Sequence, residues 1–152
     1  MLRPILIATA VAGALDILSA FVFAGMAGMM PADVLTYVAS GPFGEGVYRM
    51  GAASSLIGLA VHFTIMACMA GAYFLAARRI AALVRHPVAG GLAYGFLLWL
   101  IMYWVVKPLR WPEAPLPHTA WGIANALFSH CVLVGLPIAL VAARHFRARP
   151  AP

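Results

Sequence analysis

Four long apolar runs, separated by short polar segments, constrain this chain more than any other feature of its sequence. The runs cover roughly residues 4–30, 52–77, 88–106 and 119–143. About 20 apolar residues in a helix cross the ~30 Å hydrocarbon core of a bilayer, and a soluble domain could not bury a chain that is 64% hydrophobic and 9% charged. The sequence therefore predicts an all-α fold, an integral membrane four-helix bundle that forms a single transmembrane domain over residues 1–152.

The first run begins like a signal peptide, because Arg3 precedes an apolar segment and Ala12-Gly13-Ala14 imitates a small-residue cleavage site. The apolar character nevertheless continues to Met30. We therefore expect this segment to be the first spanning helix.

The basic residues predict the orientation, because Lys and Arg near spanning segments stay preferentially on the cytoplasmic side. Seven of the ten fall on one side of the predicted bundle: Arg3, Arg78, Arg79, Arg85, Arg144, Arg147 and Arg149. We expect both termini in the cytoplasm and a multi-pass chain in the lipid bilayer of the bacterial cytoplasmic (inner) membrane. The net charge of +6 then reflects topology, since no basic stripe with interleaved aromatic residues suggests a nucleic-acid partner.

The segment between the first two runs is too long and too polar for a tight turn inside hydrocarbon. Pro31 followed by Asp33 is typical of a helix start, and the apolar residues after them could rest on the membrane surface. The segment Gly41-Pro42-Phe43-Gly44-Glu45-Gly46 should break this helix. We expect a short interfacial helix in the first periplasmic loop.

The end of the third run is marked by Lys107-Pro108, which should stop the third spanning helix. Trp104, Trp111 and Trp121 fit an aromatic belt at the outer interface. Other aromatic residues of this helix are expected to face lipid or neighbouring proteins: Tyr94, Trp99 and Tyr103.

Three of the runs carry one ionisable residue each near the middle: Asp16, His62 and His130. Charge is expensive in hydrocarbon and usually functional. Counted from the cytoplasmic end at ~1.5 Å per residue, these residues lie roughly 18, 22 and 20 Å deep, in one layer. Such side chains rarely face lipid, and a four-helix bundle has one interior. We expect an intramembrane polar cluster of Asp16, His62 and His130.

Several roles are open for this cluster. Hydrogen bonds from one or both imidazoles to the carboxylate would brace the bundle, each contributing about 0.6 to 2 kcal/mol. A carboxyl group beside imidazoles could instead hold or pass a proton, which would make Asp16 part of a proton or small-ion pathway.

Cofactor binding is a further alternative. Two histidines on different helices at similar depth are the axial ligands by which four-helix bundles hold haem b, and His62 and His130 fit that pattern. Addition of Asp16 would instead suit a transition metal such as zinc or iron. The four apolar runs contain only this one pair of histidines, so the pattern is not specific for haem.

No phosphate-binding loop, nucleophile elbow or zinc-protease motif occurs, so the sequence gives no positive sign of an enzyme. Small residues recur on single helix faces, as at Ala12, Gly13 and Ala20, and favour close helix association. We expect an accessory or self-associating component of a membrane assembly, either a homo-oligomer or part of a larger complex.

Short motifs in all four runs resemble small bacterial inner-membrane proteins of the YagU-like family: Leu15-Asp16, residues 58–63, Gly91-Leu92-Ala93-Tyr94-Gly95, Lys107-Pro108-Leu109 and His130 with Val134-Gly135-Leu136-Pro137. The resemblance covers most of the chain. It implies a four-helix inner-membrane protein associated with stress or acid resistance, and it implies no particular active-site residues.

Overall fold

The computed structural model describes residues 1–148, most of which are helical. The elements follow in the order α1 (Leu2–Met26), α2 (Pro31–Phe43), η1 (Glu45–Arg49), α3 (Ala52–Ala77), α4 (Ala81–Arg85), α5 (Pro87–Ile101), η2 (Met102–Val106), α6 (Lys107–Arg110), α7 (Ala120–Phe128), η3 (Ser129–Gly135) and α8 (Leu136–Arg147). The short elements η2 and η3 are π-helical, and η1 is a 3-10 turn. No strand occurs within residues 1–148, and the predicted all-α class is confirmed.

Within residues 1–148, four helices are long and apolar enough to cross a membrane: Leu2–Met26, Ala52–Ala77, Pro87–Arg110 and Ala120–Arg147. The third consists of α5, η2 and α6 in succession, and the fourth of α7, η3 and α8. The four predicted spanning segments are therefore confirmed as helices, with shifted ends. The first stops at Met26, before the left-handed Gly28 with a φ of +82°, and the fourth continues to Arg147.

The prediction that Lys107-Pro108 ends the third helix is wrong, because the helix continues to Arg110. An interior proline lacks an amide donor and collides with the carbonyl group of the preceding turn. Here the π-helical η2 comes directly before Pro108, and η3 likewise precedes Pro137. The wider π turn changes the hydrogen-bond register there and allows each proline to continue the rod.

The loop between the first two spans contains α2, which begins at Pro31 as expected. The Asp33 carboxylate accepts a hydrogen bond of 2.8 Å from the Met30 amide and closes the helix start. The predicted break over residues 41–46 is confirmed, since α2 runs through Pro42, ends at Phe43 inside that segment, and is followed by Gly44 with a φ of +78°. Whether α2 lies at a membrane interface stays a prediction.

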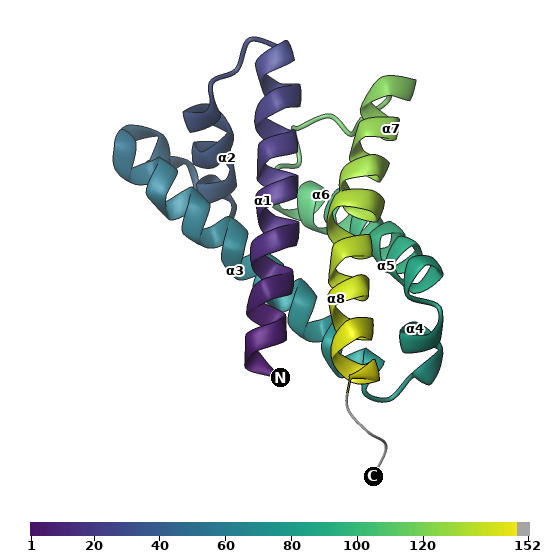
Figure 1. Ribbon diagram of the computed structural model, residues 1–152. Coiled ribbons are helices and arrows are strands. Elements are labelled where there is room, and N and C mark those ends of the chain that lie inside the picture. The colour runs from purple at the N-terminus through teal and green to yellow at the C-terminus, as the bar shows by residue number, and fades with distance from the viewer. Residues whose placement is uncertain (149–152) are drawn as a thin grey trace.

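The bundle is tightly packed at one end and spread at the other (Figure 1). α1 packs against α3 on one side and against η3 and α8 on the other, and α5 packs against η3 and α8. The buried core lies at the packed end, near both described chain ends, and includes Tyr73, Phe74, Ile138 and Ala142. α3 leans away from the other spans toward its first residues, where α2 covers it.

Two close backbone contacts hold the fourth span in place. A Cβ atom at Gly91 would lie 2.8 Å from the carbonyl oxygen of Gly135, and one at Gly95 would lie 2.7 Å from the carbonyl carbon of His130. Both distances are shorter than van der Waals contact. These glycines therefore let α5 approach the backbone that carries His130.

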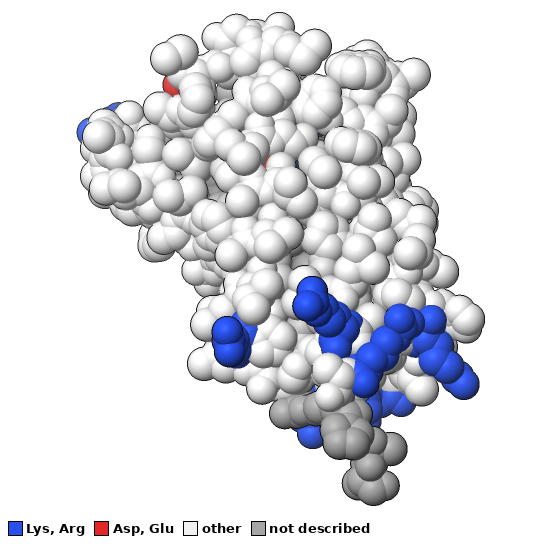
Figure 2. All heavy atoms as spheres, in the orientation of Figure 1, with Lys and Arg blue, Asp and Glu red and all other residues white. Residues whose placement is uncertain are grey.

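Basic side chains gather at the end of the molecule where α1 begins and α8 ends, at the bottom of Figure 2. The described members of this set are Arg3, Arg78, Arg79, Arg85, Arg144 and Arg147; the remaining one, Arg149, lies outside the described residues. Arg147 donates hydrogen bonds to the backbone oxygens of Val84 and Arg85, which ties the end of α8 to α4. That this end faces the cytoplasm stays a prediction.

Candidate ligand cavity

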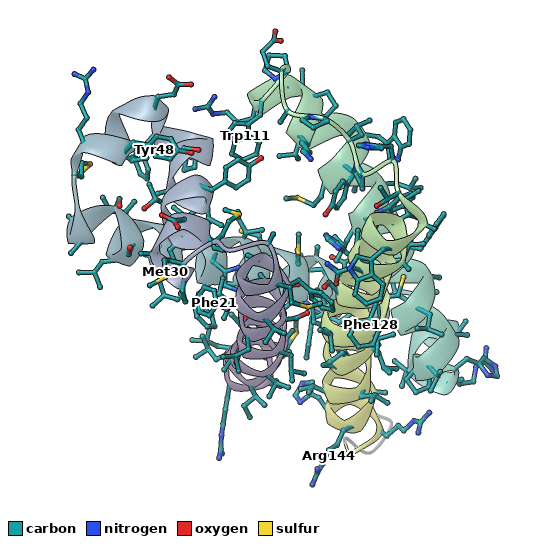
Figure 3. The ribbon with its side chains drawn as sticks, turned by 90° about the horizontal axis from the view of Figure 1, so that it is seen from above. Phe21, Met30, Tyr48, Trp111, Phe128 and Arg144 are labelled. Atoms are coloured by element: carbon teal, nitrogen blue, oxygen red, sulfur yellow. The ribbon has the colours of Figure 1, made fainter. Side chains whose placement is uncertain are left out.

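A cavity of about 640 Å³ occupies the spread half of the bundle. Its wall is formed by α1, α2, α3, the η2 and α6 end of the third span, and η3. Figure 3 shows the molecule from above and labels Trp111, one of the residues that line the cavity. Most of the wall is apolar, and its apolar residues include Val38, Pro42, Ile65, Met66, Met69, Met102, Val106, Leu109 and Val134. The volume is in the range of small-molecule sites.

All three predicted cluster residues line this one cavity. Asp16 comes from α1, His62 from α3 and His130 from η3. The Asp16 carboxyl lies close enough to both imidazoles for electrostatic interaction. Three separate elements thus bring these three residues to the wall of one mostly apolar cavity.

His62 is bonded to the backbone and not to Asp16. Its Nε2 lies 2.9 Å from the carbonyl oxygen of Gly13, and the side chain is 6% exposed. A carbonyl oxygen only accepts, so Nε2–H is the donor. The bond joins α3 to α1, and Phe63 packs its ring edge-on against the imidazole at 5.2 Å. His62 therefore braces the two helices on its own.

His130 is hydrogen-bonded within its own spanning helix. Its Nδ1 lies 2.9 Å from the carbonyl oxygen of Ala126, one turn earlier, so Nδ1 carries the proton of this bond. The Tyr103 ring meets the imidazole edge-on at 5.8 Å. Tyr103 lies in the π-helical η2 and His130 in the π-helical η3. Such π bulges occur often at functional sites.

The Asp16 carboxyl forms no hydrogen bond or ion pair with any residue in the range 1–148. The bracing role, in which the carboxylate accepts hydrogen bonds from one or both imidazoles, is therefore not seen, because His62 and His130 each donate to a backbone oxygen. Its carboxyl oxygens are left for whatever occupies the cavity.

The cofactor alternatives need imidazole nitrogens that face a common point. The Nε2 atom of His62 already faces the Gly13 carbonyl group, so only Nδ1 remains for a ligand bond. His130 keeps Nε2 unused, which is the nitrogen that axial ligands present when Nδ1 is bonded to a carbonyl. No group of three or more His, Cys, Asp or Glu side chains among residues 1–148 is arranged to hold a metal ion. The described geometry thus gives no support to a centre made of Asp16, His62 and His130.

The rim of the cavity is a clasp between α2 and the end of the third span. Arg110 donates to the backbone oxygens of Ser40 and Gly41, and Trp111 Nε1 donates to the Ser40 hydroxyl at 3.1 Å. The Trp111 indole stacks on Tyr37, with centroids 4.5 Å apart and planes inclined by 18°. These bonds occupy carbonyl groups in the last turn of α2, which explains why the helix persists through Pro42.

The Tyr37 phenol also belongs to the rim. Burial raises its pKa above the ordinary value, the neighbouring phenols of Tyr48 and Tyr103 raise it further, and the Arg110 guanidinium opposes them. The phenol therefore stays neutral and protonated at physiological pH and is available as a hydrogen-bond donor.

Lys107 lies at the rim as well, and its ammonium is engaged within the protein. Nζ donates to the Pro115 carbonyl oxygen at 2.7 Å and lies 5.5 Å from the centre of the Tyr103 ring. Both basic residues of the rim are thus anchored to backbone oxygens and aromatic faces.

Sequence reasoning missed most of the rim. Tyr103 was expected to face lipid or a neighbour but lines the cavity, and Tyr94 turns inward to donate to the Met69 carbonyl oxygen at 2.8 Å. Trp111 stacks on α2 instead of serving only as a belt residue, whereas Trp104 and Trp121 are exposed. The signal in the sequence that could have pointed to this region is a pair of prolines, Pro108 after η2 and Pro137 after η3. Each follows a π turn that lines the cavity.

Comparison with protein-family models, curated proteins and solved structures finds no significant match. The resemblance to YagU-like proteins therefore stays a prediction, and function rests on the geometry of this chain.

Proposed function

We propose that the protein binds a small lipophilic molecule in its intramembrane cavity, with the polar end of that molecule at Asp16 and His130. The supporting observation is one cavity of about 640 Å³ whose wall is mostly apolar and which Asp16, His62 and His130 all line. Ligand sites commonly combine an apolar wall with a few convergent polar groups. A membrane location would supply lipophilic molecules directly from the bilayer.

The experiment is photolabelling of the purified protein in lipid nanodiscs with a diazirine analogue of dodecanol. We expect labelled peptides from the cavity wall, around Met66 and Met102. The variant Met102→Trp fills part of the cavity and should reduce this labelling several-fold. Leu97→Trp is the matched control, because Leu97 lies on the preceding helix α5 and is 49% exposed in the isolated chain, where lipid would cover it. Labelling confined to outward residues such as Leu18, unchanged by Met102→Trp, would refute the proposal.

A proton or small-ion pathway through Asp16 is the second candidate, and the free carboxyl group in the cavity favours it. Such a path would have to continue through the packed half of the bundle, where Phe74, Ile138 and Ala142 are fully buried. We expect proton flux into liposomes, if this candidate holds, to be abolished by Asp16→Asn. Flux that is equal in both proteins would remove Asp16 from the mechanism.

Location in the bacterial cytoplasmic membrane, with both termini inside, belongs to the same proposal and is supported by the basic residues gathered at one end. Self-association, or membership of a larger complex, also stays a proposal. Several small residues that suggested it, Ala12 and Gly13 among them, are buried inside the chain. Native mass spectrometry from gentle detergent tests it directly, and monomers alone would contradict it.

A further inference from the structure

The polar end of the cavity offers hydrogen-bond acceptors that the protein itself leaves unused. The Asp16 carboxyl has no hydrogen-bonding partner among residues 1–148. His130 donates through Nδ1 to the Ala126 carbonyl oxygen, so its Nε2 atom is left without a protein hydrogen bond among residues 1–148. His62 has the opposite arrangement, because its Nε2–H is bonded to the Gly13 carbonyl oxygen and its Nδ1 atom is the nitrogen without that bond.

A ligand that bonds to the Asp16 carboxyl and to the His130 Nε2 atom would do so through a hydrogen-bond donor. A carboxylate in an apolar wall is costly without a partner, and a positively charged N–H group satisfies it better than a neutral hydroxyl does. An ammonium group has several N–H donors, so one head group can reach both the Asp16 carboxylate and the His130 lone pair. This favours a cationic head over a neutral one.

The aromatic rings of the cavity are also compatible with positive charge. The Lys107 ammonium already lies over the Tyr103 ring at 5.5 Å, and the Arg110 guanidinium lies 5.6 Å from the Trp111 ring. Tyr103 also meets His130 edge-on, which places an aromatic residue beside the free acceptors. A cation near aromatic residues is stabilised by the ring quadrupole.

An anionic lipophile fits less well, even though the rim carries two basic residues. Lys107 is bonded to the Pro115 carbonyl oxygen, and Arg110 to those of Ser40 and Gly41. An anionic head at the rim would have to compete with these bonds. Its apolar tail would then lie against the Asp16 carboxyl and leave that group unpaired, which is unfavourable.

From this arrangement we propose that the ligand is a lipophilic amine bound in its ammonium form, with the head group between Asp16 and His130 and the apolar body along the methionine-rich wall. This inference rests on the proposed function and names the ligand class of the same cavity.

The test uses three competitors of equal chain length, dodecylammonium, dodecanol and dodecanoate, against photolabelling by the dodecanol diazirine in nanodiscs. Each is kept below its micellar concentration. Charge-assisted hydrogen bonds predict that dodecylammonium competes at about tenfold or more lower concentration than dodecanol, with dodecanoate weakest. Asp16→Asn, which keeps the size of the side chain, should abolish the preference for the ammonium while labelling persists.

A second variant, His130→Gln, removes the imidazole lone pair and should reduce the ammonium preference less than Asp16→Asn does. Thermal melting of each variant shows whether it is folded. If dodecanol or dodecanoate competes best, or if Asp16→Asn retains the preference, the ligand class is wrong while cavity binding stands. If the wild-type cavity is not labelled at all, the proposed function itself fails, and the two outcomes are distinguishable.

Discussion

Substitution of Gly95 by alanine tests the close contact that positions His130. A new Cβ atom would lie 2.7 Å from the His130 carbonyl carbon and closer still to neighbouring backbone atoms. Since unstrained carbon atoms lie about 3.5 to 4.0 Å apart, α5 and η3 must separate by roughly 1 Å. Backbone atoms cannot move aside as a flexible side chain can. We therefore expect the free energy of unfolding to fall by about 1 to 3 kcal/mol or more.

The matched control is Gly71→Ala on α3, where no heavy atom lies within 4 Å of the new Cβ. Alanine there should be neutral or stabilise by up to about 1 kcal/mol, because glycine is a poor helix residue. Thermal melting in one detergent should show Gly95→Ala lower by about 3 to 10 °C and Gly71→Ala unchanged or higher. Equal melting temperatures for the two variants would refute the proposed contact between α5 and η3.

Two further substitutions test the brace and the rim. His62→Phe keeps a ring but removes the hydrogen bond to the Gly13 carbonyl oxygen. Unfolding in sodium dodecyl sulfate should therefore show a free energy of unfolding that is lower by about 0.6 to 2 kcal/mol. An unchanged free energy of unfolding would mean that the bond contributes nothing. Trp111→Ala removes the stacking on Tyr37 and the bond to Ser40, so hydrogen exchange of the α2 amides should increase several-fold, whereas Trp104→Ala, at an exposed position, should leave it unchanged. The same increase in both variants would contradict the clasp.

The spanning helices could be predicted because length and apolar composition suffice to identify a segment that crosses a bilayer. The common location of Asp16, His62 and His130 followed from counting residues along helices, since each lies at a similar depth. Neither inference needs knowledge of which helices touch.

The partners of these residues could not be predicted. The bond from His62 goes to a backbone carbonyl group on α1, which any residue at position 13 would carry, so the sequence holds no sign of it. The π turns of η2 and η3 alter which side chains point inward relative to a regular helix, and no sequence pattern showed that Tyr103 lies in such a turn. The clasp joins Arg110 to residues about 70 positions earlier and depends on how α3 leans away from the bundle.

The central claim is that Asp16 faces an open cavity while Leu18, two positions further along α1, lies on the outer surface of the bundle. Both native cysteines are free thiols, so a background with Cys68→Ser and Cys131→Ser allows single cysteines to be placed. A charged methanethiosulfonate reagent, which reacts with water-accessible thiols, is added to nanodiscs that expose both membrane faces. We predict rapid modification of Asp16→Cys and none of Leu18→Cys, which is 58% exposed in the isolated chain and so would be covered by lipid in a bilayer. Equal rates, or faster reaction at position 18, would contradict the cavity and the function built on it.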